Sequence, residues 1–431
     1  NYPDNFKTLY KHQGGRGPWG AQRIAEFTSE REDEEGTHEF ILDDSAGIVK
    51  AYEAVTQYCG WAPIEAGKTM GLFPYGKPNS KIPKIYTDGA GGDWITADRN
   101  VIVPTYPNGA VVNEGRYEVL KTPLDVEHEQ LTLLENRRDM AYAIQTESQQ
   151  MVLDLIRKAV AMSGNNNVVL SGGYGLNCVA NYWYLDQLKD EDINVFVEPV
   201  SNDAGTAVGA AYLAYHRITN DTRIHNKIND LYYGPEYMYD EHTISKIAEK
   251  YNATSISTSA TDKDVVELIT NKNIVALFQG RSEAGPRALG NRSILIDPTI
   301  KDGKDIINAK VKHREPFRPF GASVLADTCS TYFDWEYDSP YMLYCMDVRD
   351  KESFTPITHA DGTCRPQTVT PDQEDYYELI TEFEKLTGIP MLLNTSLNNG
   401  GKPIAGHPSE ALQLLNETEM NALCVGNTPV S

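Results

Sequence analysis

Cysteine is scarce in this sequence of 431 residues. There are six, and no two are spaced as a CxxC pair: Cys59, Cys178, Cys329, Cys345, Cys364 and Cys424. Small secreted domains carry a denser set of disulfides, and thiol redox sites use closely spaced pairs. We therefore expect reduced thiols and a cytoplasmic location.

Long apolar runs and a surplus of basic residues are also missing. No apolar run reaches the ~18 residues that a membrane-spanning helix needs, so we expect no membrane segment. The chain has 61 acidic and 39 basic residues, a formal charge of −22. This balance disfavours a general nucleic-acid binder, although it leaves room for a local basic cleft. The sequence opens at Asn1 without a signal-peptide pattern, so we expect it to begin inside a longer gene product or after processing.

The length and the order of local patterns predict two domains that mix helices and strands. The first ~40 residues are highly charged and are expected to be irregular. Helical spacing predicts helices over 46–60 and about 130–162, and repeated glycine and proline predict a loop over 68–84. Residues 165–216 then read twice as strand, loop and helix, which is typical of an α/β layer.

The domain boundaries follow from these patterns. We place the first domain at 1–235, a mixed polar connection at 236–262 and the second domain at 263–431. The second domain begins with the apolar strand pattern NIVALFQG, which runs directly into GRSEAGPRALGNRSILIDP at 280–298. Its glycines and prolines make a long helix unfavourable. Its arginines, Arg281, Arg287 and Arg292, suggest that an anion, in particular a phosphate, organises the segment.

Two loops of the first domain are candidates for binding a nucleotide. Ser171, Gly172 and Gly173 follow a strand and precede a helix, a geometry that directs backbone N–H groups at a phosphate. Asp203 lies after the next strand, where α/β proteins place ligands, and its carboxylate could hold a metal ion. The alternatives are a tight turn and an N-cap for a helix starting near Thr206. Two such loops within about 30 residues favour the nucleotide.

The second domain carries a dense set of cations. Lys310, Lys312, Arg314 and Arg318 lie within nine positions, and Lys312 and Arg314 would share a face if the segment were a strand. A solvated charged face is the usual explanation for such a run. Interleaved aromatics and prolines favour a shaped pocket instead. Arg365 lies near His359 and Asp361, and an apolar strand leads into Asn394, Ser396 and Asn398.

Together these motifs resemble the NodU/CmcH-type carbamoyltransferases. The segments are KTMGLFPYGKP, LSGGYGLNCVAN, VSNDAGTAVGAA, GRSEAGPRALGNRSIL, KHREPFRPFGASVL, THADGTCRPQTV and EFEKLTGIPMLLNTSLN. They occur in the family's order from about residue 46 to the end. The resemblance implies an actin-like ATPase-type (ASKHA) domain followed by a YrdC-like α/β domain.

The resemblance also implies a reaction. Such enzymes use carbamoyl phosphate and ATP to form carbamoyl-adenylate, and then transfer the carbamoyl group to a hydroxyl of a small molecule, a sugar or a modified nucleoside. ATP and a divalent metal ion, iron or magnesium, are the expected cofactors, and a homodimer is possible for the family.

The implied residues fall into three groups. The catalytic candidates are Lys312, Arg314 and Arg318. The carbamoyl-phosphate candidates are Arg287, Lys312, Arg318, Arg365, Ser396 and Asn398, which include the K-x-R and S-x-N set of the YrdC-like fold. The nucleotide candidates are Ser171, Gly172, Gly173, Asn177 and Asp203, of which Asp203 is also the metal candidate.

The sequence departs from the family pattern at one end. The family's amino-terminal His-Asp motif and metal-binding histidine pair have no match here, so we expect the first lobe of the ATPase-like domain to be missing. Two other functions use related folds or remnants of them. A tRNA threonylcarbamoyl enzyme would need an RNA-binding surface, which the charge of −22 disfavours. A non-catalytic nucleotide-binding remnant is the second alternative.

Overall fold

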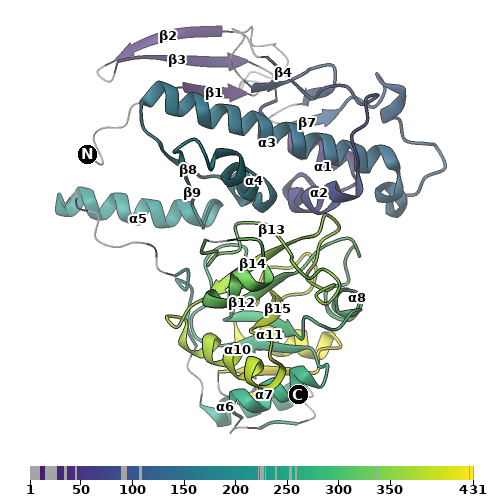
Figure 1. Cartoon of the computed structure of the whole chain (residues 1–431), viewed down its shortest axis with the longest axis vertical. Coiled ribbons are helices and arrows are strands. Elements are labelled where there is room, and N and C mark those ends of the chain that lie inside the picture. The colour runs from purple at the N-terminus through teal and green to yellow at the C-terminus, as the bar shows by residue number, and fades with distance from the viewer. Residues whose placement is uncertain are drawn as a thin grey trace. The chain divides into compact units, whose positions relative to one another are not determined.

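Figure 1 shows the computed structural model of the chain, which divides into two compact units. One unit contains Asn1–Glu198 and Thr206–Ile224, and the other contains Pro199–Gly205 and His225–Ser431. The described residues are 10–14, 27–33, 36–43, 46–88, 95–105, 109–221, 223, 228, 230–237, 240–251, 255–257, 260–335, 337–426 and 428–430.

The first unit combines helices with small sheets. Its helices are α1 (Ile48–Tyr58), α2 (Ala66–Leu72), α3 (Glu135–Ser163), α4 (Cys178–Leu188) and most of α5 (Asp203–Thr219). A three-stranded sheet has the order β1 (Tyr10–Gly14), β3 (Gly36–Asp43), β2 (Phe27–Asp33). Two hairpins pair β4 (Tyr86–Asp88) with β5 (Ile95–Ala97) and β6 (Ile102–Thr105) with β7 (Gly109–Val112). β8 (Asn167–Leu170) runs parallel to β9 (Asn194–Val197).

The long helix α3 organises this unit. Apolar residues recur along it with helical spacing, and Val152, Leu153 and Ile156 pack against Tyr184 and other residues of α4. The helix ends at Gly164, which has a φ of +67° and donates its N–H to the Val160 carbonyl at 2.8 Å. The predicted helices at 46–60 and 130–162, and the two strand–loop–helix repeats, are therefore confirmed.

Two expectations for this unit are wrong. The charged opening segment contains strands β1–β3, because backbone pairing does not require an apolar residue at every second position. Residues 66–72 form helix α2 despite Gly67 and Gly71, because burial of Thr69 and Leu72 outweighs the helix cost of glycine.

The second unit is built on an eight-stranded mixed sheet. Its order is β13 (Met346–Asp347), β14 (Thr363–Val369), β12 (Gly321–Leu325), β15 (Met391–Ser396), β11 (Arg292–Ile296), β10 (Val275–Phe278), β16 (Ala422–Val425), β17 (Thr428–Val430). β12–β14 and β10–β16 are parallel pairs, and the other neighbours are antiparallel. The helices are α6 (Glu241–Lys250), α7 (Asp262–Thr270), α8 (Gly303–Ile307), α9 (Cys329–Tyr332), α10 (Glu374–Thr387) and α11 (Pro408–Glu417). A π-helical turn, Asn308–Lys312, continues α8.

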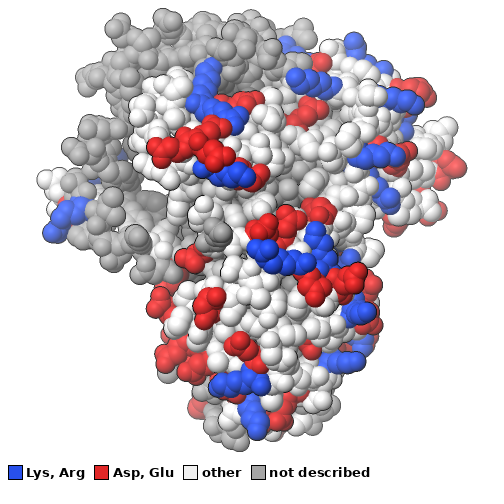
Figure 2. Space-filling view, in the orientation of Figure 1, with Lys and Arg blue, Asp and Glu red and all other residues white. Residues whose placement is uncertain are grey.

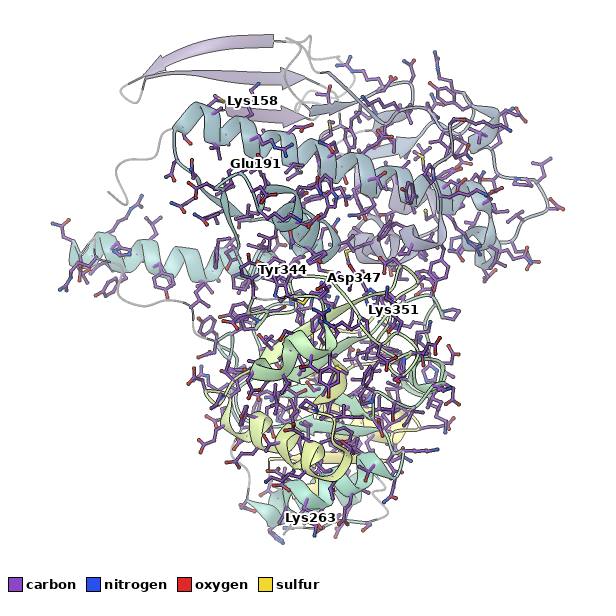
Figure 3. The ribbon with its side chains drawn as sticks, viewed as in Figure 1. Lys158, Glu191, Lys263, Tyr344, Asp347 and Lys351 are labelled. Carbon is purple, nitrogen blue, oxygen red and sulfur yellow. The ribbon has the colours of Figure 1, made fainter. Side chains whose placement is uncertain are left out.

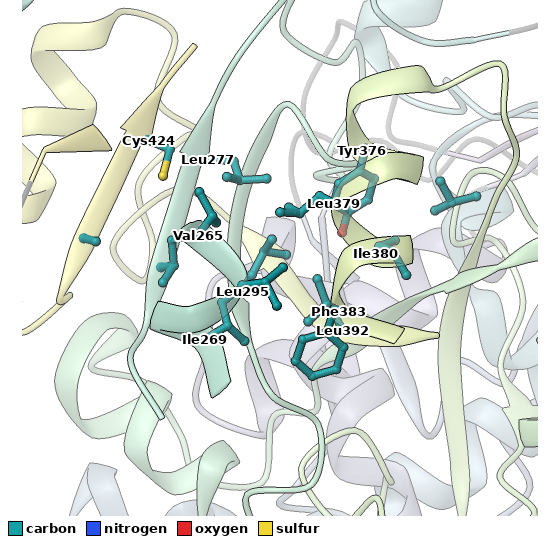
Figure 4. Packing of buried hydrophobic residues seen from close by; sticks show 14 of the residues in the cluster. Val265, Ile269, Leu277, Leu295, Tyr376, Leu379, Ile380, Phe383, Leu392 and Cys424 are labelled. Atoms are coloured by element: carbon teal, nitrogen blue, oxygen red, sulfur yellow. The ribbon is translucent and has the colours of Figure 1, made fainter. Parts of the chain in front are cut away.

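Helices α7 and α10 cover part of one face of this sheet (Figure 4). Ile269 of α7 and Phe383 of α10 are buried against Leu277, Leu295 and Leu392 of the strands. The strands read as nearly continuous apolar runs because both faces of the sheet are covered, and every residue of β10, β11 and β12 is buried.

Some of the charged side chains at the surface form ion pairs between residues close in the sequence. On the face in Figure 2, acidic and basic side chains are interspersed. Lys351 lies 3.7 Å from Asp347, both labelled in Figure 3, and Arg157 forms an ion pair with Glu191, also labelled there. The six cysteines are all buried and unpaired as disulfides. Among the described residues, no helix is long and apolar enough to cross a membrane.

Replacing Leu392 by alanine tests the core of the second unit. Leu392 is 0% exposed among α7, α10 and the strands, so Leu392→Ala should lower the unfolding free energy by about 2–5 kcal/mol. Leu386→Ala is the control, since Leu386 of α10 is 52% exposed. Urea unfolding, monitored by hydrogen exchange of the β12 and β15 amides, measures the difference in unfolding free energy between the two variants. Equal losses in the two variants would contradict this core.

Candidate anion-binding site in the second unit

One face of the sheet changes from apolar to polar along its strands. Leu325 and Val369 are paired in register, and both belong to the core beneath α10. Two positions before this pair on each strand, Ser323 is paired with Gln367. Two positions earlier still, Gly321 is paired with Arg365. Residues two apart on a strand share a face. The strands β12 and β14 therefore bring a cation, Arg365, to the end of a face that begins as hydrophobic core.

Buried amides on this face hold the 280–292 segment in place. Asn394 donates to the Ala288 carbonyl at 3.1 Å, and Gln367 donates to the Leu289 carbonyl at 2.9 Å. Ser323 links the two amides, donating to Gln367 at 2.8 Å and accepting from Asn394 at 2.9 Å. All three side chains are at most 1% exposed. A buried network of this kind fixes the backbone that it contacts.

A carboxylate fixes the same segment from within. One oxygen of Glu283 accepts the backbone N–H groups of Leu289, Asn291 and Arg292 at 2.7, 2.9 and 3.2 Å. Burial raises the pKa of Glu283, although these N–H groups act in the opposite direction. Gly290 has a φ of +116°, and a Cβ there would lie 2.5 Å from the Tyr376 ring, so only glycine fits.

The three arginines of this segment do not share one role. Arg292 is 0% exposed, donates to the carbonyls of Gln279, Gly280 and Asn291, and lies 3.6 Å over the Phe278 ring. Arg281 donates to the Tyr233 carbonyl at 3.3 Å. The idea that an anion organises all three is therefore wrong, because backbone carbonyls bind two of them. Arg287 is half-buried and directly precedes the pinned carbonyl of Ala288.

Lys312 lies at the end of the π-helical turn, not on a strand. His313 follows in the left-handed region with a φ of +44°, so the expected strand alternation of Lys312 and Arg314 is wrong. The Lys312 ammonium donates to both oxygens of Asn398, at 3.0 and 2.8 Å, and to the Ser396 carbonyl, with the Ser396 hydroxyl at 3.4 Å. This confirms that Lys312, Ser396 and Asn398 lie together.

The environment of Lys312 is unusual for an ammonium group. It is 1% exposed and its bonded partners are neutral oxygens. Burial, then repulsion from Arg314 and Arg318, holds the pKa of Lys312 well below its usual range. The Lys312 carbonyl also accepts the Gly400 N–H at 3.0 Å, and a Cβ at Gly400 would lie 2.2 Å from that carbonyl oxygen. The chain therefore needs glycine there.

Arg314, Arg318 and Arg365 complete the cationic cluster. Arg314 donates to the Asn308 side chain at 2.9 Å and to the Pro319 carbonyl at 3.3 Å, and it lies 4.5 Å over the Phe320 ring. Burial, then Arg318 and Arg365, lowers the pKa of Arg314. The Nε atom of Arg365 is buried and makes no hydrogen bond to any described residue. Cations this close repel one another, which favours a bound anion.

The nucleotide candidates are only partly brought together. Ser171, Gly172 and Gly173 form an exposed loop between β8 and a short 3-10 helix, Gly173–Leu176, and Gly172 has a φ of +88°. Asn177 caps α4 by accepting the Ala180 N–H at 3.1 Å. Its amide also donates to buried Gln145 at 3.0 Å, so its side chain is engaged in packing the first unit.

Asp203 is exposed in the first turn of α5 and belongs with the second unit. The helix begins at Asp203 rather than near Thr206, and the side chain of Asn202 accepts the Ala204 N–H at 3.0 Å. Asn202, not Asp203, therefore acts in the capping position. No group of three His, Cys, Asp or Glu side chains that could hold a metal ion occurs in the described part of the chain. Those residues do not fit a complete metal site.

Several residues of the site could not be found from the sequence. Gly400 and the Ser323–Gln367 pair act through hydrogen bonds between segments far apart in the sequence. Asn308 bonds to Arg314 only six positions away, but the π-helical turn between them is what brings the two together. Glu283 could have been noticed as the single carboxylate between Arg281 and Arg292, but its three backbone partners depend on the loop conformation.

The second unit is thus a mixed α/β fold with a cluster of cationic side chains at one end of its sheet. Residues 266–431 match the family described as Carbamoyltransferase C-terminus, and residues 19–212 match Carbamoyltransferase N-terminus. The chain belongs to the carbamoyltransferase family of enzymes, as the motifs predicted.

Three curated proteins illustrate the relationship. The nodulation protein NolO of Bradyrhizobium diazoefficiens is 32% identical over 87% of this chain and 67% of its own length. An uncharacterized protein of Synechocystis is 32% identical over 90% of this chain and 67% of its own length. The 3'-hydroxymethylcephem-O-carbamoyltransferase of Streptomyces clavuligerus is 33% identical over 60% of this chain and 47% of its own length. The matched regions thus span 47–67% of these relatives.

His359 beside this site yields a prediction about pH. Burial, with a smaller contribution from Arg365 and against that of Asp361, lowers the pKa of His359 from 6.5 to about 4. As pH falls, His359 therefore becomes protonated in the unfolded chain before it does so in the folded protein. Folding stability is lost as pH falls from about 6.5 towards 4. His359→Gln should make this loss shallower.

NMR titration of His359 and urea unfolding between pH 4 and 7 test this expectation. The imidazole should stay neutral down to about pH 5 in the folded protein, given its lowered pKa of about 4. A protonation midpoint near 6.5, or identical pH slopes in the variant and the parent, would contradict it.

Proposed function

We propose that this protein takes part in ATP-dependent O-carbamoyl transfer. Carbamoyl phosphate is first cleaved by water to carbamate and inorganic phosphate. A carbamate oxygen then attacks the α-phosphorus of ATP, giving carbamoyl-adenylate and releasing pyrophosphate. Finally an acceptor hydroxyl attacks the carbamoyl carbon, its proton is lost to solvent, and AMP leaves. The product is an O-carbamate on a small molecule, a sugar or a modified nucleoside.

The cationic cluster of the second unit is the observation that carries this proposal. Phosphate, triphosphate and developing pyrophosphate all concentrate negative charge. Arg314, Arg318 and Arg365 offer fixed guanidinium groups that suit phosphate oxygens. Lys312 binds Ser396 and Asn398, and so shapes the neighbouring loop. Arg287 extends from a backbone that buried side chains hold still.

The finer fold assignments belong to the same proposal. The second unit, with its K-x-R and S-x-N residues in contact, would be the YrdC-like domain that forms carbamoyl-adenylate. The first unit would be the actin-like ATPase-type domain, in which the Ser171–Gly173 loop contacts ATP or the adenylate. A divalent ion at Asp203 would need ligands beyond the described residues.

A radiochemical assay tests the proposal directly. The chain would be incubated with carbamoyl-labelled carbamoyl phosphate, ATP and a panel of alcohols that includes sugars, hydroxymethylcephems and hydroxymethylated nucleosides. Pyrophosphate release that depends on carbamoyl phosphate is the expected first signal, and a labelled O-carbamate is the second. If neither appears with any alcohol in the panel, the proposed activity does not belong to this chain.

Removing Arg365 should impair adenylate formation strongly. Its buried Nε atom has no hydrogen-bond partner among the described residues, so an anion is the natural acceptor. Arg365→Ala should reduce kcat/KM for carbamoyl-phosphate-dependent pyrophosphate release on the order of 100- to 1,000-fold. Arg349→Ala is the matched control, because Arg349 is half-exposed and pairs with Asp334 at 2.9 Å. Similar rates in both variants would exclude Arg365 from the site.

Removing Asp203 should separate the two half-reactions. If Asp203 supports transfer alone, Asp203→Ala should release pyrophosphate at the parental rate while the O-carbamate disappears. Asn202→Ala removes the neighbouring cap instead and should cost about 1 kcal/mol of stability with transfer retained. Unchanged carbamate yield in Asp203→Ala would leave Asp203 without a role in transfer.

A further inference from the structure

Asn308 holds the Arg314 guanidinium from its buried side. The Asn308 amide oxygen accepts from Arg314 Nε at 2.9 Å, and Asn308 is only 5% exposed. Two further contacts restrain the same guanidinium. Its Nη2 group donates to the Pro319 carbonyl at 3.3 Å, and its central carbon lies 4.5 Å from the centre of the Phe320 ring. The plane of the guanidinium is therefore set by three neighbours.

These contacts leave one N–H group of Arg314 for a ligand. Arg314 is half-buried, and its Nη1 group makes no hydrogen bond to any residue that the structure describes. The donors of a guanidinium form a planar fork, so phosphate oxygens bind well only when the plane faces them. A guanidinium that is already held in this plane loses less freedom when an anion binds.

Asn308 itself stands on a rigid base. It directly follows helix α8, and its backbone N–H donates to the carbonyls of Lys304 and Asp305. The π-helical turn begins at Asn308, and His313 in the left-handed region follows that turn. The chain thereby brings Arg314 back beside the amide six positions earlier. π-Helical turns are rare and are frequent at functional sites.

The Asn308 amide also carries a donor that the fold does not use. Its Nδ2 atom is buried and has no hydrogen-bond partner in the described part of the chain. The amide cannot simply be reversed, because its NH2 group would then face the N–H of Arg314 Nε, donor against donor. An unpaired buried donor costs free energy. An aspartate, which has only acceptors, would satisfy Arg314 without this cost.

An aspartate would, however, pair with the charge of Arg314. Arg318 and Arg365 lie close enough to repel that charge, and Glu315 attracts it less strongly. A carboxylate would therefore stabilise the fold and at the same time offset part of the positive charge of the cluster. The neutral amide is the poorer choice for folding on both counts. It is the better choice only if a ligand needs Arg314 both oriented and fully charged.

We propose that Asn308 is a positioning residue, which orients the Arg314 guanidinium towards a bound phosphate group without neutralising it. This rests on the proposed function, because it adds a residue to the machinery of the same cluster. Pyrophosphate is the probe, since it carries phosphate groups and is itself a product of the proposed first half-reaction.

A double-mutant cycle tests whether Asn308 acts through Arg314. Pyrophosphate would be titrated into the full chain by calorimetry at low ionic strength, with a chelator present. Asn308→Leu should weaken binding roughly 5- to 30-fold, because the guanidinium is no longer held in one orientation. In the Arg314→Ala background the same change should shift the affinity less than about 2-fold. Equal losses in the two backgrounds would mean that Asn308 does not act through Arg314, and would overturn the proposal.

Asn308→Asp separates orientation from charge and keeps an acceptor beside Arg314, so the local fold is retained. NMR should show slow solvent exchange of the Arg314 Nε–H in the parent and in Asn308→Asp, and fast exchange in Asn308→Leu. Pyrophosphate should nevertheless bind more weakly to Asn308→Asp than to the parent, because the introduced carboxylate offsets the Arg314 charge. Parental affinity in Asn308→Asp, or fast exchange of this N–H in the parent, would contradict the role of Asn308.

Asn136→Leu is the matched control. Asn136 donates to the carbonyls of Val119 and Lys121 in the first unit, and its amide oxygen is buried without a partner among the described residues. This variant should bind pyrophosphate with the parental affinity.

The outcomes distinguish the two proposals. If the parent shows the coupling between Asn308 and Arg314 but no pyrophosphate release that depends on carbamoyl phosphate, the proposed function fails and the role of Asn308 stands. If that release occurs while the two losses are additive, or while the parent binds no pyrophosphate, the role of Asn308 fails and the proposed function stands.

Discussion

The hydrogen bonds between sheet amides and the 288–290 backbone are the constraint on which the site depends. Asn394 and Gln367 lie where the apolar face of the sheet ends, and they donate to consecutive carbonyls of a segment rich in glycine. The Ser293 hydroxyl oxygen also accepts the Gly290 N–H at 3.0 Å. Without these bonds the segment would carry Arg287 on a chain with many conformations, and ordering it would oppose anion binding.

The charged side chains of the second unit fall into two groups, those that bond within the 280–292 segment and those of the cationic cluster. Arg292 and Glu283 bond to backbone groups inside the segment, so their charges serve the local fold. Arg314 and Arg318 lie in the segment before β12, and Arg365 lies in β14, which runs parallel to β12. The chain therefore has a strongly negative total and a concentrated positive site. The net charge of −22 constrains bulk partners but not this local chemistry.

The sequence predicts the elements better than the contacts. The strands at β8, β10 and β15 were readable because short apolar runs end at glycine, serine or asparagine. The long motifs also predicted the family and the meeting of Lys312 with Ser396 and Asn398. Local sequence patterns did not predict geometry that depends on contacts with other segments of the chain. Lys312 lies in a π-helical turn instead of the expected strand, and the Arg292 guanidinium donates to backbone carbonyls. The spacing of apolar and polar residues in the sequence predicts neither feature.

The bonding of Lys312 explains how one site can use lysine and arginine differently. An ammonium has three N–H groups, and those of Lys312 face the oxygens of Ser396 and Asn398. Its carbonyl holds Gly400, so this one residue fixes both ends of the 396–400 loop. A planar guanidinium carries more donors than its local partners use, as Arg365 shows. We therefore expect the arginines, rather than Lys312, to donate hydrogen bonds to a bound phosphate. Lys312 instead holds the 396–400 loop in one conformation.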